Sequence, residues 1–321
     1  MIEYLTKEEI RMKVSIAVIT YNSASTITDT LNSILKQDYG SENIELIISD
    51  DASTDCTVSI VKKWLDENSS SFFFTNFLES SINKGVSANI NQAWKATSCK
   101  WVKSIAGDDL LKRRCISQNV EYVAKNPKCK IVFSKMETFG LSSKIIPTDY
   151  EIKFFEKNSR EQNNYLKIFS FNMAPSAFIS KEALEHVGFA NEKYKMIEDL
   201  PLWLKMTETG YKLSFMNEVT VEYRLEESIT VSKDKYLNIP FSYDLISLYK
   251  DQLPSAFSHP FIKVVVLERL GHLYFKLAIA KISKNKRSKY TDVLNNVSWV
   301  FRPIHFVQTF SKKIYNDKMK A

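Results

Sequence analysis

The sequence predicts an α/β fold in which a mostly parallel central sheet carries helices on both faces. Short β-branched runs alternate with helical patterns four times within about 110 residues, which is the order of βαβ units. Polar clusters follow three of these runs, and ligands of open sheets bind beyond the carboxyl ends of the strands. A length of 321 residues, 44% hydrophobic and 25% charged, suits one large globular domain or a domain with an appendage.

The predicted elements follow one another in a regular order from Val14. The first strand is expected in VSIAVITYN, and the helix in SASTITDTLNSILKQD has Ser25 or Thr26 available as its cap. The second strand is expected in IELIIS and the second helix in TDCTVSIVKKWLDE. The third strand, third helix and fourth strand are expected in FFFTNFL, GVSANINQAWKAT and KWVKSIA. The fourth strand thus delivers Asp108 and Asp109 to its carboxyl end.

The second half of the chain has weaker patterns. From about Gly140 to Met173 we expect loops and short helices that shape a substrate pocket. A strand and a helix follow in APSAFISKEALEHVG. The segment IEDLPLWLKMTETGYKLSFMNEVTVEYR predicts an apolar helix, a stop at Gly210 and then two short strands.

The basic excess of the chain belongs to its C-terminal region. The net charge is +7, and residues 259–321 hold 13 Lys and Arg against 3 Asp and Glu. Basic helical stretches with apolar faces suit an anionic membrane surface, while a helical appendage or dimer contact with a solvated basic face is the alternative. No apolar run approaches the ~18 residues that span a bilayer, and the charged N-terminus lacks the apolar core of a signal peptide. We therefore expect a cytoplasmic protein that can be peripheral on the inner face of the membrane.

The cysteines and histidines do not predict a zinc site. The chain has no C-x-x-C pair, and no histidine lies near a cysteine in sequence. Reduced thiols are the default for a cytosolic chain. The four cysteines are Cys56, Cys99, Cys115 and Cys129.

Two adjacent carboxylates, Asp108 and Asp109, pose the main chemical question. Like charges repel unless a cation lies between them or solvent screens them. A solvated turn is the plain alternative, because Gly-Asp-Asp is favourable turn chemistry and Asp often caps the next helix. The segments ITYN, SDDAS and AGDD all end predicted strands, so their convergence on one edge favours a binding site.

Taken together, these segments resemble glycosyltransferase family 2. The stretches VSIAVITYNSASTITDTLNSILKQDY, IELIISDDASTD, NKGVSANINQA, AGDDLL and EDLPLWLKMTETGYKL occur in the order and spacing of that family. The resemblance covers residues 13–232 and implies the GT-A fold, with a Rossmann-like nucleotide half (about 13–110) merged with an acceptor half (about 111–232). Residues 233–321 form a mainly helical region outside it.

The resemblance also implies which residues bind the donor nucleotide. Tyr21 would offer a stacking face to the base, and ionised Asp51 would accept a hydrogen bond from the imide N–H. Lys84 lies at a helix start, which suits phosphate. A core tyrosine, a helix cap and a solvated turn are the respective structural alternatives. The implied donor-binding residues are Thr20, Tyr21, Asn22, Asp50, Asp51, Asn83, Lys84, Ser87, Asp108 and Arg224.

The metal ion and the catalytic base are implied in the same way. The family pattern Asp-x-Asp implies Mn²⁺ or Mg²⁺ bound by Asp108 and Asp109 together with the donor diphosphate, although Ala106 occupies one acidic position of that pattern. Asp199 is the implied general base, and Glu198 is implied to orient the acceptor. First-turn acids can instead simply stabilise a helix dipole.

The segment VEYRLEESIT resembles another family segment, in which basic residues approach the diphosphate. Arg224 and Ser228 match it, but Glu226 stands where that segment usually has a histidine. Arg224 would assist the leaving group or form a structural ion pair.

Two classes of function remain at this stage. The first is an inverting, metal-dependent glycosyltransferase that moves a sugar from a UDP-linked donor to a glycan or a lipid-linked (polyprenyl diphosphate) acceptor in O-antigen, capsule or related polysaccharide synthesis. The second is a non-catalytic nucleotide- or nucleic-acid-associated regulatory protein on a degenerate nucleotide-binding fold. The tail has no recognisable nucleic-acid module, so we expect no nucleic acid partner. A nucleotidylyltransferase would have a Gly-rich basic loop after the first strand, and TYNSAST is not one. The oligomeric state is left open.

Overall fold

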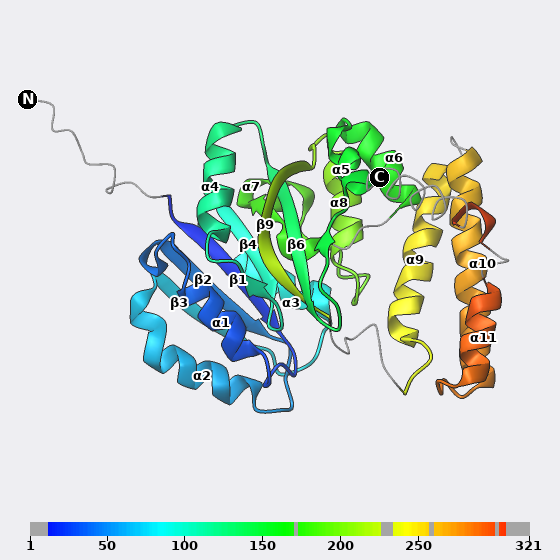
Figure 1. Ribbon diagram of the computed structural model, residues 1–321, viewed down its shortest axis with the longest axis horizontal. Coiled ribbons are helices and arrows are strands. Elements are labelled where there is room, and N and C mark those ends of the chain that lie inside the picture. The colour runs from blue at the N-terminus through cyan, green and yellow to red at the C-terminus, as the bar shows by residue number, and fades with distance from the viewer. Residues whose placement is uncertain (1–11, 170–172, 226–233, 257–259, 299–301, 306–321) are drawn as a thin grey trace, which may run out of the picture.

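The structure is a computed structural model that describes residues 12–169, 173–225, 234–256, 260–298 and 302–305 (Figure 1). One half of its sheet is parallel, as expected. The strands lie in the order β3-β2-β1-β4 and end together at one edge, at Glu79, Asp50, Thr20 and Ala106. Their bounds are Val14–Thr20 for β1, Ile44–Asp50 for β2, Phe74–Glu79 for β3 and Trp101–Ala106 for β4.

The other half of the sheet is mixed and follows β4 in the order β8-β6-β9-β5. Strand β8 (Phe178–Ser180) is antiparallel to both β4 and β6 (Ile131–Gly140). Strand β9 (Ser214–Leu225) runs parallel to β6 and antiparallel to β5 (Leu110–Leu111). The short β7 (Ile145–Ile146) pairs with β6.

Helices cover both faces of the parallel half. In Figure 1, α1 (Ile27–Leu35) and α2 (Thr57–Asn68) lie in front of the sheet, and α3 (Val86–Ala96) lies behind it. The described helices that follow are α4 (Cys115–Lys125), α5 (Asp149–Glu156), α6 (Ser159–Ile168), α7 (Lys181–Val187), α8 (Asp199–Glu208), α9 (Ile239–Ala256), α10 (Pro260–Ile282) and α11 (Lys289–Val297). The α/β prediction is confirmed, and so are the short helices between Gly140 and Met173.

Three local predictions need correction or addition. The two short strands expected after Gly210 are one strand, β9, because β6 pairs with it along its length despite register shifts at Lys135. Thr26 is the N-cap residue of α1, but its hydroxyl donates to the Gly107 carbonyl at 2.7 Å instead of capping the helix. Strand β6 and helix α4 were not expected from the sequence.

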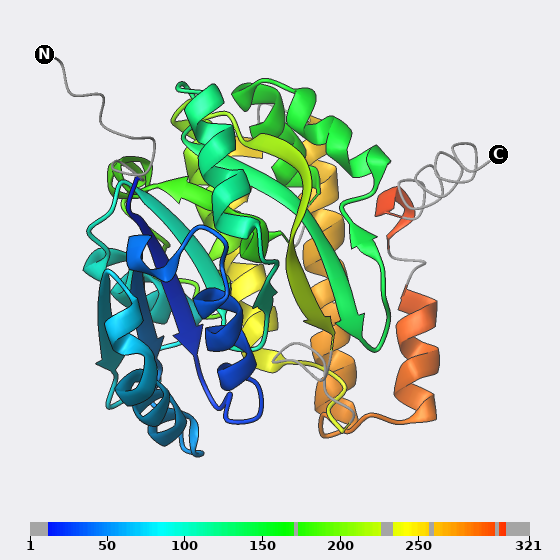
Figure 2. The ribbon, with the colours of Figure 1, turned by 60° about the vertical axis from the view of Figure 1, so that its left-hand side comes forward.

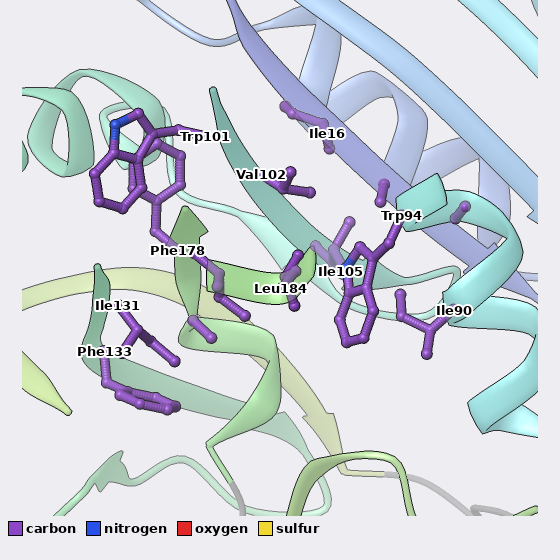
Figure 3. Close-up of a cluster of buried hydrophobic side chains, with 14 of the residues drawn as sticks. Ile16, Ile90, Trp94, Trp101, Val102, Ile105, Ile131, Phe133, Phe178 and Leu184 are labelled. Atoms are coloured by element: carbon purple, nitrogen blue, oxygen red, sulfur yellow. The ribbon is translucent and has the colours of Figure 1, made fainter. Parts of the chain in front are cut away.

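The hydrophobic core joins the two halves of the sheet (Figure 3). Ile16 of β1 and Ile90 of α3 belong to it, and so do ring pairs that include side chains of the mixed half. Trp101 stacks on Phe178 with ring centroids 5.1 Å apart. Trp203 meets Phe133 edge to face at 5.0 Å, so it is a core residue and no platform for a sugar ring.

The C-terminal helices have a core of their own. Val266, Leu270 and Leu273 of α10 pack with Ile246 and Tyr249 of α9, and this cluster reaches α6 through Ile168. This face of α10 is therefore packed within the protein. Among the described helices, none combines the length and apolarity needed to span a lipid bilayer.

Candidate active site

Asn22 joins the two loops that follow β1 and β2. Its backbone N–H donates to the Ser53 hydroxyl, and its side-chain oxygen accepts from the Thr54 N–H, both at 2.8 Å. The residue has a φ of 51°, a conformation that asparagine tolerates better than most residues. Asn22 therefore shapes this edge of the sheet, whatever it does toward a ligand.

Tyr21 and Thr20 differ in their access to solvent. Tyr21 is 40% exposed, so part of its side chain is open to solvent. Thr20 is buried, and its hydroxyl has no hydrogen-bond partner in the described chain.

The two acids at the end of β2 are buried and hydrogen-bonded. Asp50 accepts hydrogen bonds from the N–H and the hydroxyl of Ser53. Asp51 accepts from the N–H groups of Lys84 and Gly85, each at 2.8 Å. Both carboxylate oxygens of Asp51 are thus engaged in holding the loop before α3.

The start of α3 contacts the loop that leads to α8. Ser87 is fully buried, its N–H donates to the Lys195 carbonyl at 3.2 Å, and its hydroxyl donates to the Tyr194 carbonyl. Its hydroxyl is thus engaged in an internal contact. Asn83 and Lys84, by contrast, are exposed.

Gly85 allows this close approach. Its φ is +91°, and a Cβ placed there would lie 2.6 Å from the Lys195 carbonyl oxygen.

Gly85→Ala is expected to destabilise the fold by about 1–3 kcal/mol through backbone strain, with a further loss from the clash. Urea unfolding at neutral pH measures the change. Gly210→Ala is the matched control, because Gly210 has a φ of +96° but no heavy atom within 4 Å of the added Cβ. Equal losses in the two variants would contradict a role for the Lys195 contact.

Arg224 lies against the Asp108–Asp109 pair. Its N–H donates to an Asp109 carboxylate oxygen and its Nε donates to the Asp108 carbonyl, both at 2.8 Å. The guanidinium also lies 3.7 Å from the Asp29 carboxylate and over the Phe139 ring. Both predicted roles for Arg224, structural ion pair and site residue, fit this position. Ser228 and Glu226 lie outside the described residues.

Asp109 is held in an environment that favours its neutral form. Burial raises its pKa well above the ordinary value, and the charge of Asp108 raises it further. Hydrogen bonding and charge from Arg224, with the charge of Lys103, act in the opposite direction. A cation beside this pair would therefore be favourable.

Lys103 was missed by the sequence analysis. It is completely buried, its ammonium donates to the Pro175 carbonyl at 2.6 Å, and burial lowers its pKa. A lysine within the apolar strand WVKSIA was the available signal, because a buried lysine is rare without polar partners.

Glu198 and Asp199 begin α8, beyond the loop that α3 contacts. The Asp199 carboxylate accepts from the Leu200 N–H at 2.6 Å. Burial raises the pKa of Asp199. Burial, followed by the charge of Asp199, raises the pKa of Glu198 to about 8. Carboxyl groups whose pKa is raised in this way suit general acid–base chemistry.

Helix α9 holds the same loop from the other side. Asp244 accepts from the Met196 N–H at 2.7 Å, and Asp251 accepts from the Tyr194 hydroxyl and from Lys193. The sequence analysis missed both aspartates. They lie far along the chain from the loop, and no local motif marks them.

The raised pKa of Glu198 has a consequence for stability that can be measured. Between the ordinary Glu pKa of about 4.3 and a value near 8, the folded state keeps a proton that the unfolded state loses, so stability falls as pH rises. Glu198→Gln cannot lose this proton, so it does not lose stability in this way as the pH rises. The Tm of the variant minus the Tm of the parent protein should therefore increase from pH 5 to pH 8. Glu208→Gln, at an exposed position of the same helix, is the control and should show no trend. A difference that does not change with pH would contradict the assignment.

Comparisons with known proteins identify the family of the chain. The family model "Glycosyl transferase family 2" matches residues 15–188. An Escherichia coli protein, UDP-Glc:alpha-D-GlcNAc-diphosphoundecaprenol beta-1,3-glucosyltransferase WfaP, is 30% identical over 227 residues, covering 70% of this chain and 82% of that protein.

Two solved structures are similar in fold. The complex of Staphylococcus aureus TarS 1–349 with UDP-GlcNAc has a TM-score of 0.59 at 19% identity, covering 82% of this chain and 73% of that one. The mannosyltransferase PcManGT from Pyrobaculum calidifontis, with GDP-Man and Mn²⁺, has a TM-score of 0.56 at 19% identity, covering 94% and 84%. Both likenesses support the expected GT-A fold. Because the family match spans more than half of the sequence, the chain belongs to glycosyltransferase family 2.

Proposed function

We propose that the protein transfers a sugar, with inversion at the anomeric carbon, from a UDP-linked donor to a lipid-linked diphosphate acceptor. One observation carries the proposal: hydrogen bonds join Asp51, the start of α3 and the Lys195 loop, and this loop leads directly to Glu198 and Asp199. The other acidic pair, Asp108–Asp109, follows β4, which is paired with β1. The name of the E. coli relative supplies the UDP-sugar and the diphosphoundecaprenol acceptor, and the TarS complex holds UDP-GlcNAc.

We propose Mn²⁺ or Mg²⁺ as the metal, bound by Asp108 and Asp109. The residues fit a cation because the two carboxylates are adjacent and the pKa of Asp109 is raised. The described residues contain no group of three or more potential His, Cys, Asp or Glu ligands, so donor phosphate oxygens would complete the coordination. A bound divalent cation would neutralise charge on the leaving diphosphate. PcManGT was solved with Mn²⁺.

In the proposed reaction, Asp199 accepts the proton of the acceptor hydroxyl while that oxygen forms its bond to the anomeric carbon. The bond from this carbon to the diphosphate breaks, and UDP leaves with the electron pair. Glu198, which holds its proton near neutral pH, donates a hydrogen bond that orients the acceptor. Tyr21 stacks on the base, and Asp51 accepts a hydrogen bond from the imide N–H of that base. Lys84 and Asn83 approach the phosphates of the donor. Arg224 stabilises the leaving group beside Asp108.

The test uses the purified protein with Mn²⁺, a panel of UDP- and GDP-sugars and a synthetic GlcNAc-diphospho-lipid acceptor. We expect UDP release that depends on acceptor, and a product of inverted anomeric configuration by NMR. Acceptor-dependent turnover with a GDP-sugar alone would contradict the UDP assignment, and a retained configuration would contradict the direct displacement.

We also propose that the C-terminal region contacts an anionic membrane surface on the cytoplasmic side. Phe261, Val264 and Leu267 of α10 are about half exposed, and Lys263 lies among them in sequence. On such a surface the apolar side chains can insert at the headgroup boundary, and the basic side chains are attracted to anionic lipid. The full chain should sediment with phosphatidylglycerol vesicles at low salt, and Val264→Asp with Leu267→Asp should release it. Failure of the parent chain to sediment would contradict this proposal.

A further inference from the structure

A pocket lies outside the candidate active site, and most of its lining residues belong to α9 and α10. These two helices lie side by side (Figure 2). Its volume is about 270 Å³, room for about nine waters at the volume of the liquid. One part of its lining is apolar and another is basic. The apolar side chains are Leu237, Phe241, Leu245 and Leu273, and the basic ones are Arg269, His272, Lys276 and Arg302.

The basic side chains converge because of helical spacing. Arg269, His272 and Lys276 recur three and four residues apart, so they lie on one face of α10. Arg302 joins them from the segment that follows α11. Nε of Arg302 and Nδ1 of His272 are buried and have no hydrogen-bond partner in the part of the chain that the structure describes.

These groups repel one another. Burial and the charge of Arg302 lower the pKa of Lys276, and burial and the charge of Arg269 lower that of Arg302. The pKa of His272 is lowered to about 4, chiefly by burial and then by the charges of Arg302 and Lys276. The nearby acid Glu268 accepts hydrogen bonds from the N–H groups of Ile304 and His305, at 3.1 and 3.2 Å.

Part of this basic lining is already engaged. The guanidinium of Arg269 donates to the Ile168 carbonyl and lies over the Tyr249 ring. Lys276 and the Nε of Arg302 are therefore the main donors for a ligand. Collecting like charges in a half-buried pocket is unfavourable unless an anion offsets them. The pocket has the composition of an anion site, because it combines a planar guanidinium with an ammonium group.

We propose that this pocket binds a phosphate or diphosphate group, at a site separate from the nucleotide site. The anion would accept hydrogen bonds from Arg302 and Lys276. The apolar wall of Leu237, Phe241 and Leu245 would lie against whatever hydrocarbon the group carries. The site does not depend on sugar transfer, because none of its lining residues belongs to the candidate active site.

The test measures binding of sodium pyrophosphate to the full chain, with EDTA and saturating UDP present to exclude the donor site. Calorimetry should show one pyrophosphate per chain, and pyrophosphate should raise Tm relative to NaCl of equal ionic strength. Lys276→Gln and Arg302→Gln should each weaken binding at least tenfold. Lys281→Gln, which removes an exposed lysine from the same helix, should not change it.

Lys276→Gln also removes a repelling charge, so its Tm without pyrophosphate should not fall. This variant therefore keeps the test valid even if Arg302→Gln folds poorly. The proposal is overturned if the parent chain binds no pyrophosphate, or if Lys276→Gln binds it as tightly as the parent.

The source of the phosphate can be distinguished with farnesyl diphosphate, used below its micellar concentration. A lipid-borne diphosphate predicts that farnesyl diphosphate binds at least tenfold more tightly than pyrophosphate and that Leu245→Asn removes this advantage. Equal affinity for both probes identifies a free phosphate or diphosphate as the ligand. Loss of farnesyl diphosphate binding on Lys276→Gln is required in either case.

Discussion

Asp199→Asn is expected to lower kcat by about 10²–10⁴-fold, because it removes the group that takes the acceptor proton. Asparagine keeps the shape of the side chain and can still accept from the Leu200 N–H, so the start of α8 should be preserved. Donor binding should survive, because the proposed role of Asp199 is toward the acceptor. The measurement is kcat at saturating donor and acceptor, with Tm and UDP affinity determined on the same preparation.

Glu198→Gln is the matched comparison for this experiment. Glutamine still donates a hydrogen bond to the acceptor, as protonated Glu198 would, so the loss of kcat should be smaller than that of Asp199→Asn. If Asp199→Asn retains near-parental turnover and Glu198→Gln is inactive, Glu198 is the base and the roles are exchanged.

Asp108→Ala is expected to weaken UDP binding in the presence of Mn²⁺ by about 10²-fold, and binding in EDTA should change little. The reason is that the Asp108 carboxylate would hold the metal that neutralises the diphosphate. No role toward the base is proposed for Asp108. Asp109→Asn should have a similar effect, and it keeps an acceptor oxygen for the Arg224 N–H. Calorimetry with and without Mn²⁺ separates the two contributions.

Asp29→Ala is the control for these variants, because Asp29 approaches the Arg224 guanidinium from an exposed position. It should leave Mn²⁺-dependent UDP affinity unchanged. UDP affinity that is insensitive to Mn²⁺ in the parent protein would remove the metal from the proposed mechanism.

The sequence was most informative where structure is local. Strands β1 to β4 are short apolar runs with polar ends, and each of the first three is followed by a helix with clear periodicity, so pattern alone locates them. Strand β6 has the mixed sequence IVFSKMETFG, and its identity as a central strand depends on partners β8 and β9 that lie far along the chain. That β9 is one strand and not two also depends on pairing with a distant strand, β6.

The candidate site shows the same limit. Adjacent acids such as Asp108 and Asp109 are visible as a motif, whereas Asp244 can be connected with Met196 only after α9 has folded onto the body. Ser87 could not be assigned to an internal contact from its motif, because its partner carbonyl is 107 residues away. Long-range hydrogen bonds decide these roles, and they leave no local pattern.

The attachment of α9 to the Tyr194–Met196 loop affects where two related enzymes can be joined to make a chimera. The family match ends at residue 188, and the two aspartates that hold the loop stand more than fifty residues later. A cut between α8 and α9, by contrast, would separate Glu198 and Asp199 from the two aspartates that hold their loop. A chimera joined after α9 would keep both together, so α8, α9 and the loop between Tyr194 and Met196 are best inherited as one exchangeable unit.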